Sequence, residues 1–185
     1  MKFSEKFRYC PSCGSASFVS HNFKSKRCEN CGFIFYYNPS AATAAFIRNS
    51  DGNLLVCRRA KEPAKGTLDL PGGFIDYDET AEEGIAREVK EELGINVNDL
   101  HYIFSLPNDY LYSGLNVPTM DLFFEGKVAN DTKLKAADDV NEALFIPLRE
   151  IYSQLFGLNS VRKAVEMYIA KHSPLNSPRG TFGIT

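Results

Sequence analysis

The sequence predicts a mixed α/β domain preceded by a small cysteine-rich module, and three observations support this fold class. Four of the five cysteines fall in the first 31 residues as two Cys-x-x-Cys pairs. Short apolar runs bounded by turn residues indicate strands from Thr43 onward, and residues 80–93 have the composition and capping signals of a helix. The 185 residues, 44% of them hydrophobic, suffice for one sizeable core. We therefore expect one main domain with a small appendage.

The cysteine module contains two matching knuckles, Cys10-Pro-Ser-Cys13-Gly and Cys28-Glu-Asn-Cys31-Gly. Four thiolates in this spacing favour tetrahedral Zn²⁺. Because four sulfur ligands leave no open position for water, we expect a structural zinc that supplies folding free energy to a short segment. A redox role would need an isolated, activated Cys-x-x-Cys pair, and the repeated pair argues against it. The predicted organisation is a zinc ribbon, a main domain and a tail over residues 1–36, 37–172 and 173–185.

Charge is distributed unevenly along the chain. Through residue 31 there are six basic and two acidic residues, a charge of +4, so the formal net charge of −2 leaves −6 for the remainder. This balance excludes a protein that is basic throughout, but the basic ribbon leaves nucleic acid open as a partner. A homodimer is a second possible use of the ribbon, because aromatic residues follow its cysteines, namely Phe33, Phe35, Tyr36 and Tyr37.

Features of a membrane or secreted protein are missing from the sequence. No apolar run approaches the roughly 20 residues that span a bilayer. Residues 1–8 alternate charge with phenylalanine and contain no apolar signal-peptide segment. Five cysteines are an odd number for a disulfide framework. We expect a soluble, cytoplasmic protein with no membrane partner.

The first elements of the main domain are well marked. Two strands, Thr43–Arg48 and Leu54–Arg59, are expected to form a hairpin around the turn Asn49–Asn53. Residues 68–75 are expected to be extended around Pro71-Gly72-Gly73. A helix should then cover Thr80–Leu93, because Thr80 and Glu83 have capping-box spacing and Gly94 follows its last residue.

The second half of the domain alternates strands and helices. We expect further strands at residues 102–105, 120–128 and 143–146, and helices at residues 148–156 and 160–171. Residues 173–185 are rich in proline and glycine, with few large apolar residues, and this composition favours a flexible tail.

The helix at residues 80–93 carries an unusual group of carboxylates. Glu88, Glu91 and Glu92 have the spacing i, i+3 and i+4, which places them on one face. Like charges at these spacings cost roughly 0.2–0.5 kcal/mol per pair, unless a cation lies among them. Oxygen ligands of this kind suit Mg²⁺ or Mn²⁺, which also bind substrate phosphates. The alternative is a solvated acidic face, but the adjacent Gly-Gly turn and Arg87 favour a shaped site.

These residues also carry a family resemblance. Gly73–Ile95 reads GFIDYDETAEEGIAREVKEELGI, which resembles the Nudix box, G-x5-E-x7-R-E-U-x-E-E-x-G-U with U a bulky aliphatic residue. Every specified position is filled, by Gly73, Glu79, Arg87, Glu88, Val89, Glu91, Glu92, Gly94 and Ile95. The resemblance implies an α/β/α sandwich with a mixed sheet that hydrolyses a nucleoside diphosphate linked to another group.

Roles for individual residues follow from the same resemblance. It implies that box glutamates bind Mg²⁺ or Mn²⁺, so we assign metal binding to Glu88 and Glu92, with Glu91 as a ligand or as the catalytic base. Glu79 is a further candidate ligand, and Arg87 can fix carboxylate directions. Family members often supply one more acidic group from a later loop, where Asp139 and Glu142 lie in this chain. For these last two, a solvated turn is an equal alternative.

A zinc ribbon placed before the box resembles the NADH pyrophosphatase branch, whose members cleave NADH or NAD⁺ to a nicotinamide mononucleotide and AMP. Two features of that branch are missing from this sequence: a further N-terminal domain before the ribbon, and the motif S-Q-P-W-x-F-P-x-S after the box, where this chain has residues 105–112 and no tryptophan. NADH, NAD⁺ and ADP-ribose therefore stay open as substrates. The rival hypothesis is a nucleotide sensor or nucleic-acid-binding protein, with action on nucleotide-capped RNA included.

Candidate substrate contacts are few. The Gly72-Gly73 turn and Phe74 lie next to the box, and Tyr110 and Tyr112 could provide ring faces for a base, because such stacking is worth about 1–3 kcal/mol. An ordinary packing role on the sheet is at least as probable a use of these aromatic residues.

Overall fold

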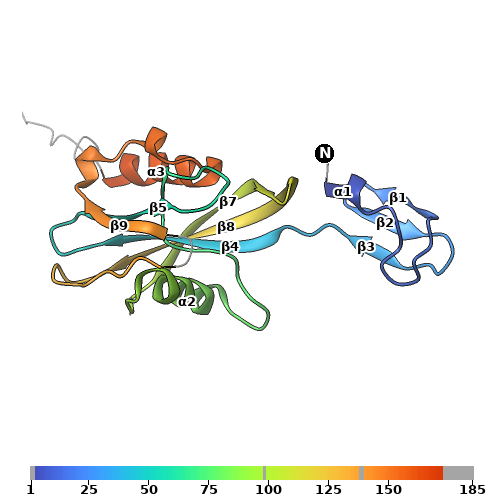
Figure 1. Cartoon of the computed structure of the whole chain (residues 1–185), viewed down its shortest axis with the longest axis horizontal. Helices are drawn as coiled ribbons and strands as arrows, with labels where there is room; N and C mark the ends of the chain where they lie inside the picture. The colour runs from blue at the N-terminus through green and yellow to red at the C-terminus, as the bar shows by residue number, and fades with distance from the viewer. Residues whose placement is uncertain (1–2, 98, 138–139, 173–185) are drawn as a thin grey trace, which may run out of the picture.

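The fold is known from a computed structural model that describes residues 3–97, 99–137 and 140–172. It contains a small three-stranded sheet and a separate six-stranded sheet, joined by an extended segment (Figure 1). The predicted tail at 173–185 and the candidate ligand Asp139 lie outside the described residues. The elements are α1 (Phe3–Lys6), β1 (Phe18–Asn22), β2 (Ser25–Cys28), β3 (Ile34–Tyr36), β4 (Ser40–Arg48), β5 (Leu54–Arg59), β6 (Leu68–Asp69), α2 (Ala81–Leu93), β7 (His101–Tyr112), β8 (Leu115–Lys127), β9 (Val140–Ile146), η1 (Leu148–Glu150), η2 (Ser153–Leu155) and α3 (Asn159–His172).

The six-stranded sheet is mixed. Its order is β6-β5-β4-β8-β7, with β9 paired to β5, and only β4 and β8 run parallel to each other. The turn predicted between β4 and β5 is present, but the two strands share a single residue pair, Arg48↔Leu54, and then diverge. The segment after β6 lies beside β4 instead: the N–H groups of Thr43 and Ala45 donate to the carbonyls of Gly73 and Pro71. The glycine turn is thereby held at the point where β4 and β5 separate.

Two helices cover opposite faces of this sheet (Figure 1). The apolar face of α2, centred on Ile85 and Val89, packs with one set of sheet residues that includes Phe124. The apolar face of α3 packs with the other set, which includes Phe46 and Phe123. The α/β/α arrangement expected from the sequence is confirmed.

The predicted limits of α2 and α3 agree closely with the structure. The hydroxyl of Thr80 accepts a hydrogen bond from the Glu83 N–H, the Glu83 side chain accepts one from the Thr80 N–H, and Gly94 ends α2 in the left-handed conformation. This capping box satisfies backbone donors at the helix start, where no intrahelical acceptor exists. None of the helices in the described ranges is long and apolar enough to cross a membrane.

β7 and β8 form a hairpin far longer than the predicted strands. Pro107 and Pro118 make these segments look unlike strands, because proline cannot donate a ladder hydrogen bond. Both positions tolerate it: β7 is the edge of the sheet, and Pro118 precedes Thr119, where pairing of β8 with β4 begins. The hairpin carries Asn108 and Tyr110 into the region of the glycine turn.

The helix predicted at residues 148–156 is wrong. The structure has two short 3₁₀ segments, η1 and η2, separated by extended backbone at Ile151 and Tyr152. This interruption lets the side chains of both Ile151 and Phe156 enter the core beneath α3. A continuous helix could not direct these two side chains to the same place.

α3 is also tied to the sheet by a buried polar contact. The Tyr168 hydroxyl donates to Glu125 Oε1 at 2.6 Å, and Arg48 pairs with the same oxygen at 2.8 Å. The Tyr168 ring stacks on Phe46 with centroids 4.0 Å apart. Burial and the neighbouring carboxylate raise the pKa of Tyr168 well above its usual value, so the hydroxyl stays a donor.

The small sheet forms the cysteine module. Cys10, Cys28 and Phe18 are buried at its centre, and Phe7 and Phe35 pack against them. Tyr37 also belongs to this unit, because its N–H donates to the Lys24 carbonyl and its ring lies 5.7 Å from Phe7. Of the aromatic residues considered for a dimer surface, Phe35 and Tyr37 therefore pack inside the module, whereas Phe33 and Tyr36 are exposed.

Candidate functional site

Both glycines of the turn lie very close to neighbouring atoms. At Gly72, which has a φ of 145°, an added Cβ would lie 2.1 Å from the carbonyl oxygen of Thr43. At Gly73, an added Cβ would lie 2.6 Å from the carboxyl carbon of Glu88. The two glycines therefore bring the backbone into direct contact with β4 on one side and with the acidic face of α2 on the other.

Glu92 and Glu88 are the two box carboxylates that line a cavity beside this turn. The cavity has a volume of about 280 Å³, and its wall includes Gly72, Gly73 and Phe74. Glu92 is only 7% exposed, and its Oε2 accepts a hydrogen bond from the Gly72 N–H at 3.1 Å. This hydrogen bond fixes the carboxylate relative to the turn.

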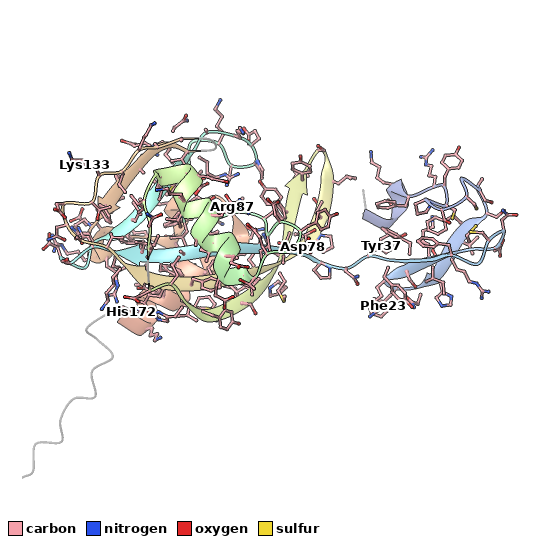
Figure 2. The ribbon with its side chains drawn as sticks, turned by 90° about the horizontal axis from the view of Figure 1, so that it is seen from below. Phe23, Tyr37, Asp78, Arg87, Lys133 and His172 are labelled. Atoms are coloured by element: carbon pink, nitrogen blue, oxygen red, sulfur yellow. The ribbon has the colours of Figure 1, made fainter. Side chains whose placement is uncertain are left out.

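Arg87, which Figure 2 labels on α2, forms hydrogen bonds with three glutamates of the box. Its Nε and Nη2 donate to both oxygens of Glu79, at 2.6 and 3.0 Å. Its Nη1 donates to Glu88 at 2.9 Å and to Glu91 at 3.1 Å, and Nη2 also donates to the Phe74 carbonyl at 3.0 Å. The hydrogen bonds from Arg87 lower the pKa of Glu79. The pKa of Arg87 is raised, first by the hydrogen bonds to Glu79 and then by those to Glu88 and Glu91. One guanidinium thus joins three glutamates to the glycine turn.

The predicted site residues separate into two groups. Glu88, Glu92, Gly72, Gly73, Phe74 and Tyr110 line the cavity, whereas Glu79, Glu91, Glu142 and Tyr112 do not. The side chain of Glu91 is half exposed, and Glu142 on β9 forms an exposed ion pair with Arg58 at 3.1 Å. Tyr112 is 61% exposed at the tip of the β7–β8 hairpin. The structure therefore brings two of the box carboxylates, the turn and two aromatic rings together.

The two aromatic rings of the cavity contact each other edge to face. The centroids of Phe74 and Tyr110 are 5.6 Å apart with an angle of 83° between the ring planes. The Arg59 Nη2 donates to the Tyr110 hydroxyl at 3.4 Å, and Arg59 also pairs with Asp69. The rings are an apolar part of a cavity wall that also contains carboxylates, which suits a ligand with a flat ring and a charged end.

Four polar residues of this cavity carry no signal in the sequence. They line the cavity from four different strands: Arg59 from β5, Asp69 from β6, Asn108 from β7 and Asp121 from β8. Burial raises the pKa of Asp69, although the adjacent Arg59 opposes this shift. The alternation of polar and apolar residues along a strand is the one sequence signal that could have indicated these residues. It does not say which face of the sheet lines a cavity.

The carboxylates facing the cavity fit a divalent cation of the magnesium type. Mg²⁺ is usually held by one or two carboxylates together with substrate phosphates, not by a closed protein cage. Glu88 and Glu92 provide such a partial set of oxygen donors. Among the described residues, a tight cluster of metal-ligand atoms is found only at the cysteines.

The four cysteines fit zinc closely. Their sulfur atoms all lie within 4.8 Å of one another, with Cys10–Cys31 at 3.7 Å and Cys13–Cys28 at 3.6 Å. A tetrahedron with Zn–S bonds of about 2.3 Å has S···S edges of roughly 3.8 Å. Hydrogen bonds from the Ser15 backbone and the Asn30 side chain lower the pKa of Cys13 to about 6, which favours the thiolate that zinc binds.

Replacing Cys28 by serine is expected to abolish stoichiometric zinc binding and to unfold the ribbon while the main domain stays folded. The ribbon core around Cys28 is separate from the two cores of the main sheet, so its loss leaves them intact. Metal analysis and hydrogen exchange of the purified chain would measure both effects. Cys57→Ala is the matched control, because Cys57 lies in the main core and should not change the zinc content. Full zinc occupancy in Cys28→Ser would contradict the assignment.

Gly73→Ala is expected to lower kcat by up to about 100-fold with little change in melting temperature. The added methyl group would displace the carboxyl group of Glu88, a mobile end of a side chain, so the structural cost is small while the geometry of the site is lost. Steady-state kinetics and a thermal melt of the same sample test this separation. A folded variant with unchanged kcat would mean that the position of Glu88 has no influence on turnover.

A mixed sheet between two helices, with a glycine turn packed on the glutamates of one helix, defines the Nudix class of fold. Residues 38–166, more than half of the chain, match the family model of the NUDIX domain. The chain belongs to the NUDIX family.

Known proteins with similar sequence or structure extend this comparison. The chain is 32% identical over 104 residues to the NAD-capped RNA hydrolase NudC of Vibrio atlanticus, covering 56% of this chain and 38% of that protein. It is 32% identical over 134 residues to the ADP-ribose pyrophosphatase of Methanocaldococcus jannaschii, covering 71% and 75% of the two chains. The crystal structure of a NUDIX hydrolase from Nitrosomonas europaea superposes with a TM-score of 0.69 at 21% identity, covering 89% and 92%. The chain thus spans less than half the length of the Vibrio relative.

Proposed function

We propose that this protein is a metal-dependent hydrolase that cleaves the pyrophosphate bond of a nucleoside diphosphate linked to a second group, with NADH, NAD⁺ or ADP-ribose as the substrate. The observation that carries this proposal is the cavity itself. Glu88 and Glu92 face it from α2, and the rings of Phe74 and Tyr110 form another part of the same wall. A site that binds a nucleoside diphosphate needs carboxylates for the cation on its phosphates and an apolar surface for its ring.

In the proposed site, Glu88 and Glu92 hold Mg²⁺ or Mn²⁺, and Glu91 is a ligand or the base. A bound divalent cation would neutralise phosphoryl oxygens and lower the pKa of a coordinated water molecule. Arg87 acts as a positioning residue, because it fixes Glu88, Glu91 and Glu79 at hydrogen-bond distance. The Gly72 N–H orients Glu92, so the carboxylate does not have to reorganise when substrate arrives.

The names of two relatives support this choice of substrates. One is called an NAD-capped RNA hydrolase and the other an ADP-ribose pyrophosphatase. Both names describe a nucleoside diphosphate linked to a further moiety. Asp139 is proposed to supply an additional ligand, whereas Glu142, which is paired with Arg58, is the weaker of these two candidates.

Hydrolysis of a substrate panel tests the proposal. The purified chain is incubated with Mg²⁺ or Mn²⁺ and with NADH, NAD⁺, ADP-ribose, diadenosine polyphosphates, nucleotide sugars and nucleoside triphosphates, and products are separated by chromatography. We expect the highest kcat/KM for NADH, NAD⁺ or ADP-ribose, and no turnover after chelation of the catalytic metal. If a folded and metal-loaded sample hydrolyses no substrate of the panel, the hydrolase assignment is wrong and a nucleotide sensor becomes the better assignment.

A second candidate function is supported by the surface of the ribbon. Phe23 is 95% exposed at the β1–β2 turn, and the Lys24 amine lies 5.9 Å from the centre of its ring. Figure 2 places Phe23 at the end of the ribbon that is nearer the main domain. Exposed rings among basic side chains are typical of surfaces that bind single-stranded nucleic acid. The ribbon is therefore proposed to contact the RNA of a nucleotide-capped substrate.

Salt dependence distinguishes RNA binding from binding of a small dinucleotide. Each phosphate contact to a single strand contributes a slope of about −0.7 to the dependence of log K on log salt. We expect affinity for a short RNA with NAD at its 5′ end to fall steeply with salt, and Phe23→Ala to weaken it without changing hydrolysis of free NAD⁺. RNA and dinucleotide affinities with equal salt dependence would rule out this use of the ribbon.

Self-association is a separate proposal about the ribbon. Phe33 and Tyr36 are 39% and 45% exposed and could contact a second copy of the chain. Sedimentation of the full chain, compared with a double variant that carries serine at both positions, measures it. A mass that corresponds to a monomer in both samples would exclude the homodimer.

A further inference from the structure

One aspartate of the cavity, Asp121, has no role in the chemistry described so far. Asp121 lies on β8, is 8% exposed and lines the same cavity as Glu88 and Glu92. The cavity is also lined by Val161 of α3, and α2 and α3 cover opposite faces of the sheet (Figure 1). The cavity therefore extends from the box carboxylates on the α2 side to the first turn of α3, where Asp121 is found.

Among the described residues, the hydrogen-bond partners of Asp121 are neutral donors from three different elements. Asn108 Nδ2 of β7 donates to Oδ2 at 3.0 Å, the Ser160 hydroxyl of α3 donates to the same oxygen, and the Thr119 hydroxyl donates to Oδ1 at 2.6 Å. Within the part of the chain that the structure describes, no lysine, arginine or histidine forms an ion pair with it. Asp69, another aspartate of the wall, differs because it is paired with Arg59.

The hydrogen bonds of Asp121 leave one acceptor position open. A carboxylate offers about four acceptor sites on its two oxygens and no donor. Two donors occupy Oδ2, but only the Thr119 hydroxyl reaches Oδ1. A ligand group beside Oδ1 is therefore expected to be a donor, since an oxygen acceptor at that position would face the negative oxygen of a buried carboxylate.

We propose that Asp121 determines specificity by accepting a hydrogen bond from an amino group carried by the flat ring of the substrate. This inference rests on the proposed function, because it concerns a nucleotide bound in the same cavity. The shared chemistry is an –NH₂ donor in the plane of an aromatic ring, as in the 6-amino group of adenine and in the carboxamide of nicotinamide. Rings that carry an oxygen acceptor there, as hypoxanthine and nicotinic acid do, are disfavoured.

The size of the cavity agrees with one half of a dinucleotide. Its volume of about 280 Å³ lies below the roughly 300–1,000 Å³ of sites that enclose a drug-sized ligand. Phe74 and Tyr110 supply the apolar surface for one ring, and the box carboxylates lie where its phosphates would need a cation. One ring-bearing half therefore occupies the cavity, and Asp121 senses which ring that half carries.

Binding of two matched pairs of mononucleotides tests the proposal without requiring turnover. Calorimetry in the presence of Mg²⁺ compares AMP with IMP, and nicotinamide mononucleotide with nicotinic acid mononucleotide, in the wild-type chain and in Asp121→Asn. We expect the wild type to bind the amino-bearing member of one pair roughly 10- to 100-fold more tightly, the range for a hydrogen bond to a charged group. The pair that responds identifies the half that enters the cavity. Asp121→Asn should reduce that preference to less than about threefold.

Ser160→Ala is the control for a purely structural role. This variant removes a donor to the same carboxylate but leaves its charge, so we expect a lower melting temperature with the ring preference retained. Equal binding of both members in both pairs by the wild type would overturn the proposal without any variant. A preference that persists in folded Asp121→Asn would overturn it as well.

The same measurements separate this inference from the proposed function. If the wild type prefers the amino-bearing ring, and Asp121→Asn loses that preference, while no substrate in the panel is hydrolysed, the inference stands and the hydrolase assignment fails. If hydrolysis is observed without any ring preference, the hydrolase assignment stands and the role of Asp121 is wrong.

Discussion

Replacing Glu92 by glutamine is expected to reduce kcat by at least roughly 10- to 100-fold, because even changes behind the ligands of a metal site cost that much. Glutamine keeps the size of the side chain and an oxygen that can accept the hydrogen bond of the Gly72 N–H. Only the negative charge is lost, so the turn is retained while the divalent cation binds more weakly. Kinetics at increasing Mg²⁺ should show a lower kcat together with a higher half-saturating metal concentration.

Glu82→Gln provides the matched control on the same helix. Glu82 is exposed in the first turn of α2, and its replacement removes the same charge outside the cavity. We expect its kcat to stay within about twofold of the wild type, since exposed charges far from a site are largely screened. If Glu92→Gln turned over as fast as this control, the metal-binding role of Glu92 would be wrong.

Replacing Gly72 by alanine is expected to lower the free energy of unfolding by at least about 2 kcal/mol, since strained backbone and overpacking act together there. The added Cβ would lie 2.1 Å from the Thr43 carbonyl oxygen and 2.7 Å from Ala44 Cα, both of which belong to the backbone of β4. Backbone in a sheet cannot move aside as a side chain can. Urea denaturation of wild type and variant measures the loss.

Gly52→Ala isolates the contribution of this contact. Gly52 also has a positive φ, of 80°, but nothing lies within 4 Å of an added Cβ. Its replacement should cost only the backbone strain, about 1 kcal/mol. Equal losses of stability for the two variants would mean that the close approach of the turn to β4 does not constrain the fold.

Local signals made part of this structure predictable. The capping box and Gly94 define α2 because their hydrogen bonds join residues three or four apart, and the cysteine knuckles define the ribbon for the same reason. Glu88 and Glu92 of the box are four residues apart on α2, so they share one face of the helix. That both of them line the cavity therefore follows mostly from short-range geometry.

The rest of the site depends on pairing between distant segments. The parallel register of β4 with β8 joins Ala42 to Asp121, and the β7–β8 register sets Asn108 opposite Thr119. No periodicity in the sequence specifies such registers, and two prolines conceal the length of the hairpin. The prediction of a helix at residues 148–156 was wrong for a related reason. The apolar spacing of this segment is compatible with a helix, but Ile151 and Phe156 both have to reach the core.

The contacts between α3 and the sheet link the C-terminal turns of this helix to the selection of the ligand. Tyr168 lies two residues beyond the NUDIX family match, yet its ring and hydroxyl contact Phe46 and Glu125 in the centre of the fold. The same helix brings Ser160 to Asp121. A recombinant fragment that stops at residue 166 would lose this attachment and loosen the polar end of the cavity. Changes that detach α3 from the sheet are therefore expected to alter which ring is accepted, even where every residue of the cavity is kept.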